Sequence, residues 1–332
     1  MPDRGRYVRS VYWAAALTLT ATVLAGCSGQ GSVQTLGRSI EQMPGVISST
    51  VSYDTTWWGA ARNVRLTTVL ANAATADQAE AIGKAFAESA GSDLADVDVD
   101  LTVDYRVVER ERPPLTSTAN FHFAGPDRPT VQGVTEALRE WLTVAKSSGV
   151  QSVGFEQPAA GGPAGSRAVR ITVARGAKDT ELQALVRDHP DLATATWTVV
   201  GGSLTEASPL AADYPEVYTV TGMVPDERLR ELWRRIVSSL GENGIAAADT
   251  DMSRVASKLP PTNVVVNFPS SRNREQSVAT AWLMLPLLQG LPQPARVDFN
   301  GDLFTMGGCS GADDSSSGSA RQAELRTKFE RC

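Results

Sequence analysis

The stretch that decides the fold is residues 97–105, which read Val-Asp-Val-Asp-Leu-Thr-Val-Asp-Tyr. Apolar side chains occupy every second position, with three aspartates and a threonine between them. Because successive side chains of a strand point to opposite faces of its sheet, this pattern predicts a strand with one buried and one solvated face. Shorter alternations at 194–199 and 296–300 predict two similar strands. Strands of this kind are typical of antiparallel sheets that helices cover on one face.

A different period predicts helices elsewhere in the chain. In residues 131–145 and 226–240, apolar side chains recur every three to four positions and would share one helix face. Thr75 and Gln78 have the spacing of a capping box, so a helix should begin at Ala76. Helices and alternating strands together predict an α+β fold.

The order helix, strand, strand, helix, strand recurs along the chain. A predicted helix ends at each of Gly45-Val46, Gly149-Val150 and Gly244-Ile245, with offsets of 104 and 95 residues. The second strands follow at nearly the same offsets, which indicates internal repetition. The sequence therefore predicts about three ferredoxin-like units, each an antiparallel sheet with helices on one face, at 34–125, 129–222 and 225–308.

The first 26 residues have the composition of a secretory signal peptide. Three arginines lie in residues 1–10, and residues 11–24 form an uncharged stretch of 14. That stretch is shorter than the roughly 20 residues of a membrane-spanning helix. It is followed by Leu24-Ala25-Gly26-Cys27, which resembles the lipobox of bacterial lipoproteins. The resemblance implies cleavage before Cys27, acylation of this cysteine, a lipidated tether over 27–33 and location on the extracytoplasmic face of the cell membrane. An ordinary signal peptide cut near a cysteine is the alternative.

Two further cysteines, Cys309 and Cys332, lie near the end of the chain. Outside the cytoplasm, an even pair of cysteines usually forms a disulfide. The region 309–332 is predicted to be a flexible Ser/Gly-rich linker and a C-terminal helix, which the disulfide would tie back to the body of the protein. A redox-active or metal-binding pair is the alternative, although the spacing fits no common metal motif.

The charge and the histidines exclude two classes of site. The net charge is −6, and an acidic chain without a long basic run is a poor nucleic-acid binder. His122 and His189 have no second histidine or cysteine at metal-ligand spacing. Asp98 and Asp100 fall on the predicted solvated strand face and lack the glycine and glutamate of a calcium loop. We therefore expect no metal site.

Motifs of the common catalytic classes are missing from the sequence. It contains neither the serine motifs of hydrolases and penicillin-binding proteins nor a phosphate-binding glycine loop. We therefore expect no cofactor and no enzymatic activity. The adjacent Trp57 and Trp58 fall in a predicted loop, where exposed aromatic side chains can contact a sugar, a protein partner or a membrane interface.

These observations favour a non-catalytic binding or scaffold lipoprotein of the cell envelope. Its partners would be the membrane, through lipid on Cys27, and an envelope protein or cell-wall component contacted through Trp57 and Trp58. Two alternatives remain open: a carrier of a lipid or other apolar ligand, and an envelope hydrolase that uses dispersed carboxylates.

Overall fold

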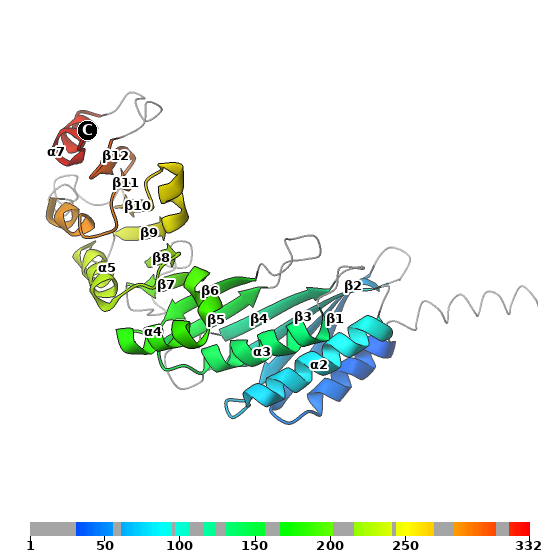
Figure 1. Ribbon diagram of the computed structural model, residues 1–332. Helices are drawn as coiled ribbons and strands as arrows, with labels where there is room; N and C mark the ends of the chain where they lie inside the picture. Colours follow the sequence, from blue (N-terminus) through cyan, green and yellow to red (C-terminus); the bar gives the residue numbers. More distant parts are fainter. Residues whose placement is uncertain are drawn as a thin grey trace, which may run out of the picture. The chain divides into compact units, whose positions relative to one another are not determined.

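A computed structural model describes most of the chain after the first 30 residues, and its ribbon is shown in Figure 1. The chain divides into two compact units. The first contains β1 to β4, α2, most of α3 and the end of β5, and the second contains the start of β5 and the later elements. The described residues are 31–55, 61–94, 97–106, 116–123, 130–156, 167–201, 216–240, 244–268, 282–309 and 319–332.

The first unit confirms the α+β fold class. Its strands follow one another across the sheet in chain order. The pairs β1–β2 and β3–β4 are antiparallel, whereas β2–β3 and β4–β5 are parallel. Its elements are helical residues 31–41, β1 (Val46–Thr55), β2 (Ala61–Leu70), α2 (Ala76–Ser92), β3 (Asp98–Arg106), β4 (Thr116–Phe123), α3 (Val131–Ala145) and β5 (Val150–Glu156).

The second unit continues with the same alternation of pairings. The pairs β6–β7, β8–β9 and β10–β11 are parallel, and β7–β8, β9–β10 and β11–β12 are antiparallel. Its later elements are β6 (Ala168–Val173), α4 (Asp179–Asp188), η1 (Pro190–Thr194), β7 (Thr196–Val200), β8 (Val217–Thr221), α5 (Glu227–Leu240), β9 (Ile245–Asp251), η2 (Met252–Ser257), β10 (Thr262–Asn267), helical residues 282–288, β11 (Ala295–Phe299), β12 (Asp302–Met306) and α7 (Ala320–Phe329).

The sheets are mixed, so the predicted antiparallel pairing is wrong for five of the ten strand pairs whose register the structure describes. Strands that flank an α-helix pair as parallel neighbours, because the helix returns the chain to the same end of the sheet. In a ferredoxin-like unit, another strand lies between the two parallel strands. Here the parallel strands are direct neighbours, so the three ferredoxin-like units are not confirmed. The sheet also continues from β8 to β9, across the predicted boundary at 222–225.

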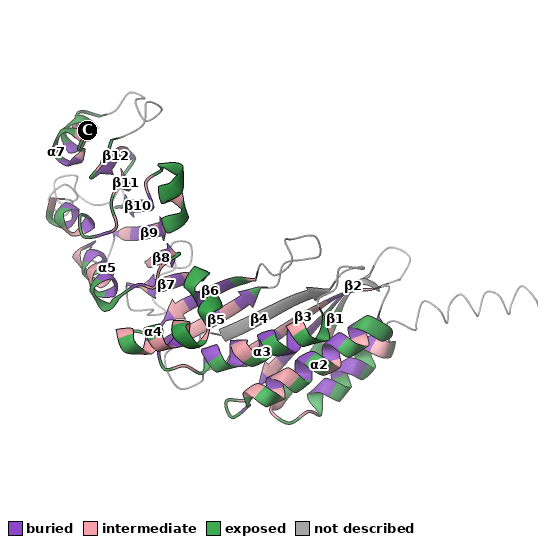
Figure 2. Ribbon diagram, in the orientation of Figure 1, coloured by how far each residue is buried: buried purple, intermediate pink, exposed green. Residues whose placement is uncertain are grey.

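In the first unit α2 and α3 lie on one face of the sheet, in the second unit α4 and α5 do so, and the core forms between these helices and the strands (Figure 2). The buried side of β3 is the one expected from its alternation: Val99, Leu101 and Val103 have no exposed surface. Trp141 on α3, and Trp197 on β7, are also fully buried. Burying a large apolar side chain contributes about 2 kcal/mol or more, so these residues fix which face the helices cover.

The predicted repetition extends to local hydrogen bonds. The N–H of Ala71 donates to the carbonyl of Gly45 at 2.8 Å, and in the second repeat Ala174 donates to Gly149 at 3.0 Å. The helices that follow begin alike. The backbone N–H of Thr75 donates to the Gln78 side chain at 2.9 Å, which confirms that part of the capping box, and Lys178 donates to Glu181 at 3.2 Å. The first two repeats therefore share a turn and a helix start as well as an order of elements.

Candidate binding face

The face of the second unit's sheet opposite α4 and α5 carries short polar side chains. Every second residue of β7 and β8 is buried against the helices, and the residues between them are half-buried threonines and valines. On β9, Asp249 and Asp251 occupy the corresponding positions. Because the strand period is two, this face combines the outward-pointing positions of each strand.

The strand register aligns six of these positions into one line, which we call the polar row. It begins with threonines on β6, β7 and β8 and ends with charged and amide side chains on β9 to β11. Strands are spaced about 4.8 Å apart, so the row is roughly 24 Å long. Its members, each opposite the next, are Thr172, Thr198, Thr219, Asp249, Asn263 and Arg296.

Two contacts lie beside the row or involve its members: one between two hydroxyls and one ion pair. The hydroxyls of Thr196 and Thr221 are 3.1 Å apart. At the other end, Asp249 accepts a 2.6 Å hydrogen bond from Arg254 on η2 and a 3.3 Å bond from the amide of Asn263. The Asp249 and Arg254 side chains are 41% and 32% exposed, so the pair is accessible to a partner. The face thus offers hydroxyl groups on β6 to β8 and charged and amide side chains on β9 to β11.

Asp251 has a structural role at the same end of the face. Its carboxylate accepts hydrogen bonds from the backbone and hydroxyl of Ser253, at 2.9 and 2.7 Å, and so caps η2. These hydrogen bonds, helped by Arg254, lower the pKa of Asp251. η2, which carries Arg254, is therefore fixed next to Asp249.

The first unit has a polar face built in the same way. Arg65 on β2 lies opposite Asp100 on β3, with 3.9 Å between the guanidinium and the carboxylate. Thr67 and Thr102 are the next opposite pair on this face. Asp98 is exposed and Asp100 is half-buried. This agrees with the predicted solvated strand face.

In the described part of the structure, the hydroxyls of the row lack the hydrogen bond to a base that would activate a nucleophile. A threonine nucleophile needs an adjacent base. Among the residues that the structure describes, Thr172, Thr198 and Thr219 have no hydrogen bond to a histidine or a carboxylate. The described residues also contain no group of three or more His, Cys, Asp or Glu that could hold a metal ion. The side chains of this face can donate and accept hydrogen bonds.

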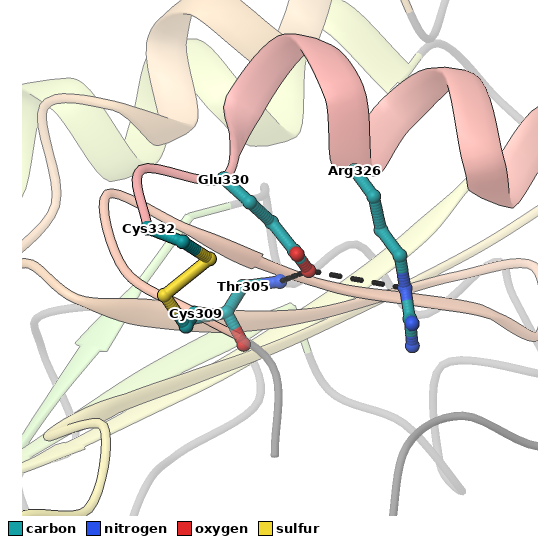
Figure 3. Close-up of a disulfide and its surroundings, with 5 residues drawn as sticks. All are labelled: Thr305, Cys309, Arg326, Glu330 and Cys332. Carbon is teal, nitrogen blue, oxygen red and sulfur yellow. Dashed lines mark hydrogen bonds and ion pairs between the residues drawn. A yellow bond between two sulfur atoms is a disulfide. The ribbon is translucent and has the colours of Figure 1, made fainter. Parts of the chain in front are cut away.

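The predicted disulfide between Cys309 and Cys332 is confirmed (Figure 3). Their Cα atoms are 5.2 Å apart, and both residues are exposed. The bond joins Cys309, three residues after the end of the edge strand β12, to Cys332, three residues after the end of α7. It therefore ties the segment after α7 to the edge of the sheet.

α7 covers the outer edge of β12 through hydrogen bonds to the backbone. The carbonyl of Leu303 accepts from Gln322 at 2.8 Å and from Arg326 at 3.3 Å. The N–H of Thr305 donates to Glu330 at 3.1 Å (Figure 3). Farther along, Gly307 donates to the carbonyl of Phe329, at 3.1 Å. Sheet edges otherwise leave such groups open to another strand, so α7 and its disulfide close this edge.

The remaining residues of interest in the sequence are Cys27, Trp57, Trp58 and the two histidines. Cys27, Trp57 and Trp58 lie outside the described residues, as does the side chain of His122. His189 is the C-cap residue of α4, where its N–H donates to the carbonyl of Leu185 at 2.9 Å. Among the helices of the described residues, none is long and apolar enough to cross a membrane.

Sequence reasoning missed one buried ionic contact. Arg230 on α5 is 1% exposed, and it donates to the carbonyls of Pro225 and Ala177, both at 2.7 Å. It also lies 2.9 Å from the carboxylate of Asp179 at the start of α4. The sequence gives little indication of this contact, because Arg230 lies one position beside the apolar stripe of the predicted helix. Arg230 joins α5 to the loop before α4 and so belongs to the framework of the sheet.

A buried chain of hydroxyls was also missed. Tyr218, Thr250 and Thr262 lie on neighbouring strands. The hydroxyl oxygen of Thr250 is 2.7 Å from that of Tyr218 and 2.8 Å from that of Thr262. Thr262 then donates to the carbonyl of Pro292 at 2.7 Å. Because each residue also fits an alternating strand, only the structure reveals that the hydroxyls face the core.

Comparison with protein-family models, curated proteins and solved structures found no match to this chain.

Proposed function

We propose that the chain is a cell-envelope lipoprotein with a non-catalytic binding or scaffold role on the outer face of the membrane. The lipobox-like sequence that ends at Cys27 supports the anchor. The anchor would hold the protein at the surface, and the sheet would present its polar face to an envelope protein or a cell-wall component. No cofactor is required for this role.

The observation that carries the proposal is the polar row. A sheet face that six strands line with hydroxyl, amide and charged side chains is suited to an extended polar partner. Hydroxyl groups both donate and accept hydrogen bonds, so the row can contact either peptide groups or sugar hydroxyls. Asp249 with its ion-pair partner Arg254, and Arg296 at the end of the row, add charged groups that can orient a partner.

The repeated α+β arrangement supports a scaffold role in particular. Each unit builds a sheet with α-helices on one face and polar side chains on the other, so the same kind of polar face is formed twice. We propose that three related units, at the sequence bounds given above, arose by duplication. Extended concave or flat binding surfaces are a common use of such repetition.

The proposal is tested by chemical cross-linking in intact cells. The wild-type chain and a Cys27→Ser variant are compared, and the captured species are identified by mass spectrometry. We expect a reproducible protein or peptidoglycan adduct that is lost in Cys27→Ser because the variant leaves the membrane. If wild type stays at the membrane and captures nothing, the binding role is wrong.

Two variants locate the contact surface. Thr198→Arg with Thr219→Arg adds two bulky cations to the middle of the polar row and should abolish capture. The matched control is Gln183→Arg with Ser238→Arg, which adds the same charge to exposed positions of α4 and α5 in the same unit. Equal capture by both double variants would exclude the polar row as the contact surface.

The tryptophan pair has its own test. Replacing Trp57 and Trp58 with alanine should weaken capture without lowering the thermal midpoint of unfolding. Removing aromatic contact residues commonly reduces affinity by about 2 kcal/mol, which is roughly thirtyfold. Unchanged capture would remove these residues from the proposed contact surface and leave the polar row in place.

A further inference from the structure

The edge strands β1 and β12, each considered within its own unit, differ in what covers their outer edges. The outer edge of β12 is covered by α7, which bonds to Leu303 and Thr305. β1 pairs with β2 on one side, and among the described residues no strand pairs with its other side. An edge of this kind presents backbone donors and acceptors at which another strand can add.

The residues of β1 do not discourage strand addition. Residues 46–53 read Val-Ile-Ser-Ser-Thr-Val-Ser-Tyr and contain no charge and no proline. The pairing with β2 is regular from Ser48 to Asp54, so no bulge interrupts this part of the strand. Ile47 is 64% exposed. Natural proteins usually protect an exposed edge with lysine, proline or a bulge, and the central part of β1 has none of these.

We propose that β1 pairs antiparallel with β1 of a second copy of this chain. Residues 46–53 carry no charge, which favours self-association because no like charges meet along this part of the strand. The one charged residue of β1, Asp54, would fall opposite Val46 when Thr50 lies opposite its own copy. A strand such as β3, with Asp98, Asp100 and Asp104, would bring its carboxylates together under the same operation. The proposal does not depend on the binding function proposed above.

The order of hydroxyl residues in β1 suits this symmetry. A two-fold axis at Thr50 places Thr50 opposite its own copy, and Ser48 opposite Ser52. Such hydroxyl pairs are favourable between adjacent strands. The molecule already uses them: Thr196 and Thr221 are 3.1 Å apart on neighbouring strands, and Ser49 and Thr68 are 3.4 Å apart.

The pairing would have a consequence for the polar faces. Antiparallel pairing of two identical edge strands makes a closed, two-fold dimer in which the sheet continues from one copy to the other. The axis is perpendicular to the sheet, so the face with Thr50, Thr67 and Thr102 lies on the same side in both copies. Two polar faces on one surface would raise the avidity for a repetitive partner.

The test is cysteine cross-linking of the full chain in intact cells. Ser48→Cys, Thr50→Cys and Ser52→Cys are each oxidised and examined on non-reducing gels. The control is Thr67→Cys, which lies on the same face one strand farther from the edge. Wild type controls for cross-links through the native cysteines. We expect Thr50→Cys to shift the chain to a dimer band more completely than the other variants, and Thr67→Cys to match wild type.

A charge variant provides an independent readout. Thr50→Lys places two cations opposite each other across the axis and should reduce the dimer fraction about fivefold. This fraction is measured by native mass spectrometry of the detergent-solubilised chain. Thr67→Lys should leave the dimer unchanged. The proposal is overturned if no edge variant gives a dimer band, if Thr67→Cys cross-links as well as Thr50→Cys, or if the cross-linked band contains a different protein.

Discussion

The backbone N–H of Thr305 donates a hydrogen bond to the carboxylate of Glu330 at 3.1 Å, which joins the edge strand β12 to the residue that ends α7. The Cys309–Cys332 disulfide fixes the chain beside this bond. Phe329 adds an apolar contact, since it is 7% exposed and its ring lies 5.9 Å from that of Phe304. Covalent, polar and apolar contacts therefore hold α7 over the same strand edge.

Removing the disulfide should destabilise this cover. We expect Cys309→Ser with Cys332→Ser to lower the free energy of unfolding by about 3 kcal/mol, because a cross-link over 23 residues restricts the unfolded chain by that amount. Urea unfolding followed by tryptophan fluorescence measures the change. Wild type under reducing conditions should match the double variant, and an unchanged midpoint in both would contradict the prediction.

Hydrogen exchange identifies where the cover opens. The amide of Thr305 donates to Glu330 and that of Gly307 donates to the Phe329 carbonyl, so both lose their acceptors if α7 leaves. We expect faster exchange at these two amides after reduction. Val264, inside the sheet on β10, serves as the reference. Equal acceleration at Val264 would indicate global unfolding instead of local release.

Arg230 should be a sensitive position despite its polar side chain. Arg230→Met keeps much of the side-chain volume but leaves the carbonyls of Pro225 and Ala177 without their donor. Breaking a buried, hydrogen-bonded charge costs about 3 kcal/mol or more. Arg235→Met, at an exposed position of the same helix, is the control and should change the free energy of unfolding by less than about 0.5 kcal/mol. Similar losses in both variants would refute the role of the buried contact.

The sequence predicts the elements of this fold well because burial follows their periods. The alternation of β3 correctly identifies Val99 and Leu101 as core residues, and the stripe of α3 identifies Leu138 and Trp141. The same alternation does not predict whether neighbouring strands are parallel or antiparallel. A strand with one wet face alternates in the same way whether its neighbour is parallel or antiparallel. The direction here follows from the connections, because each helical crossover returns the chain to the same end of the sheet.

The candidate site shows a second limit of sequence reasoning. Thr198 and Thr219 are separated by a long connection, so their opposition in the polar row depends on strand register. Arg230 illustrates the converse difficulty. The helical period assigned Leu232 to the core, but Leu232 is half-buried and Arg230 is buried because nearby backbone carbonyls accept its hydrogen bonds. Patterns of apolar residues do not encode such partners.

The hydroxyl of Tyr218 should make the free energy of unfolding depend on pH in the alkaline range. Burial raises the pKa of Tyr218 to about 12, from an ordinary value of 10, although its hydrogen bond with Thr250 acts in the opposite direction. Between these two values, the folded chain keeps a proton that the unfolded chain has lost. Unfolding then releases a proton, so the free energy of unfolding falls as the pH rises through this window.

Tyr218→Phe separates this effect from the other titrations of the chain. At pH 8 the variant should be less stable than wild type by about 1 kcal/mol, because it loses the 2.7 Å hydrogen bond to Thr250. At pH 11 wild type should itself have lost about 1 kcal/mol through Tyr218, whereas phenylalanine does not titrate. The two chains should therefore converge in urea unfolding at pH 11. A difference that stays constant from pH 8 to pH 11 would show that the Tyr218 hydroxyl titrates alike in the folded and unfolded chains.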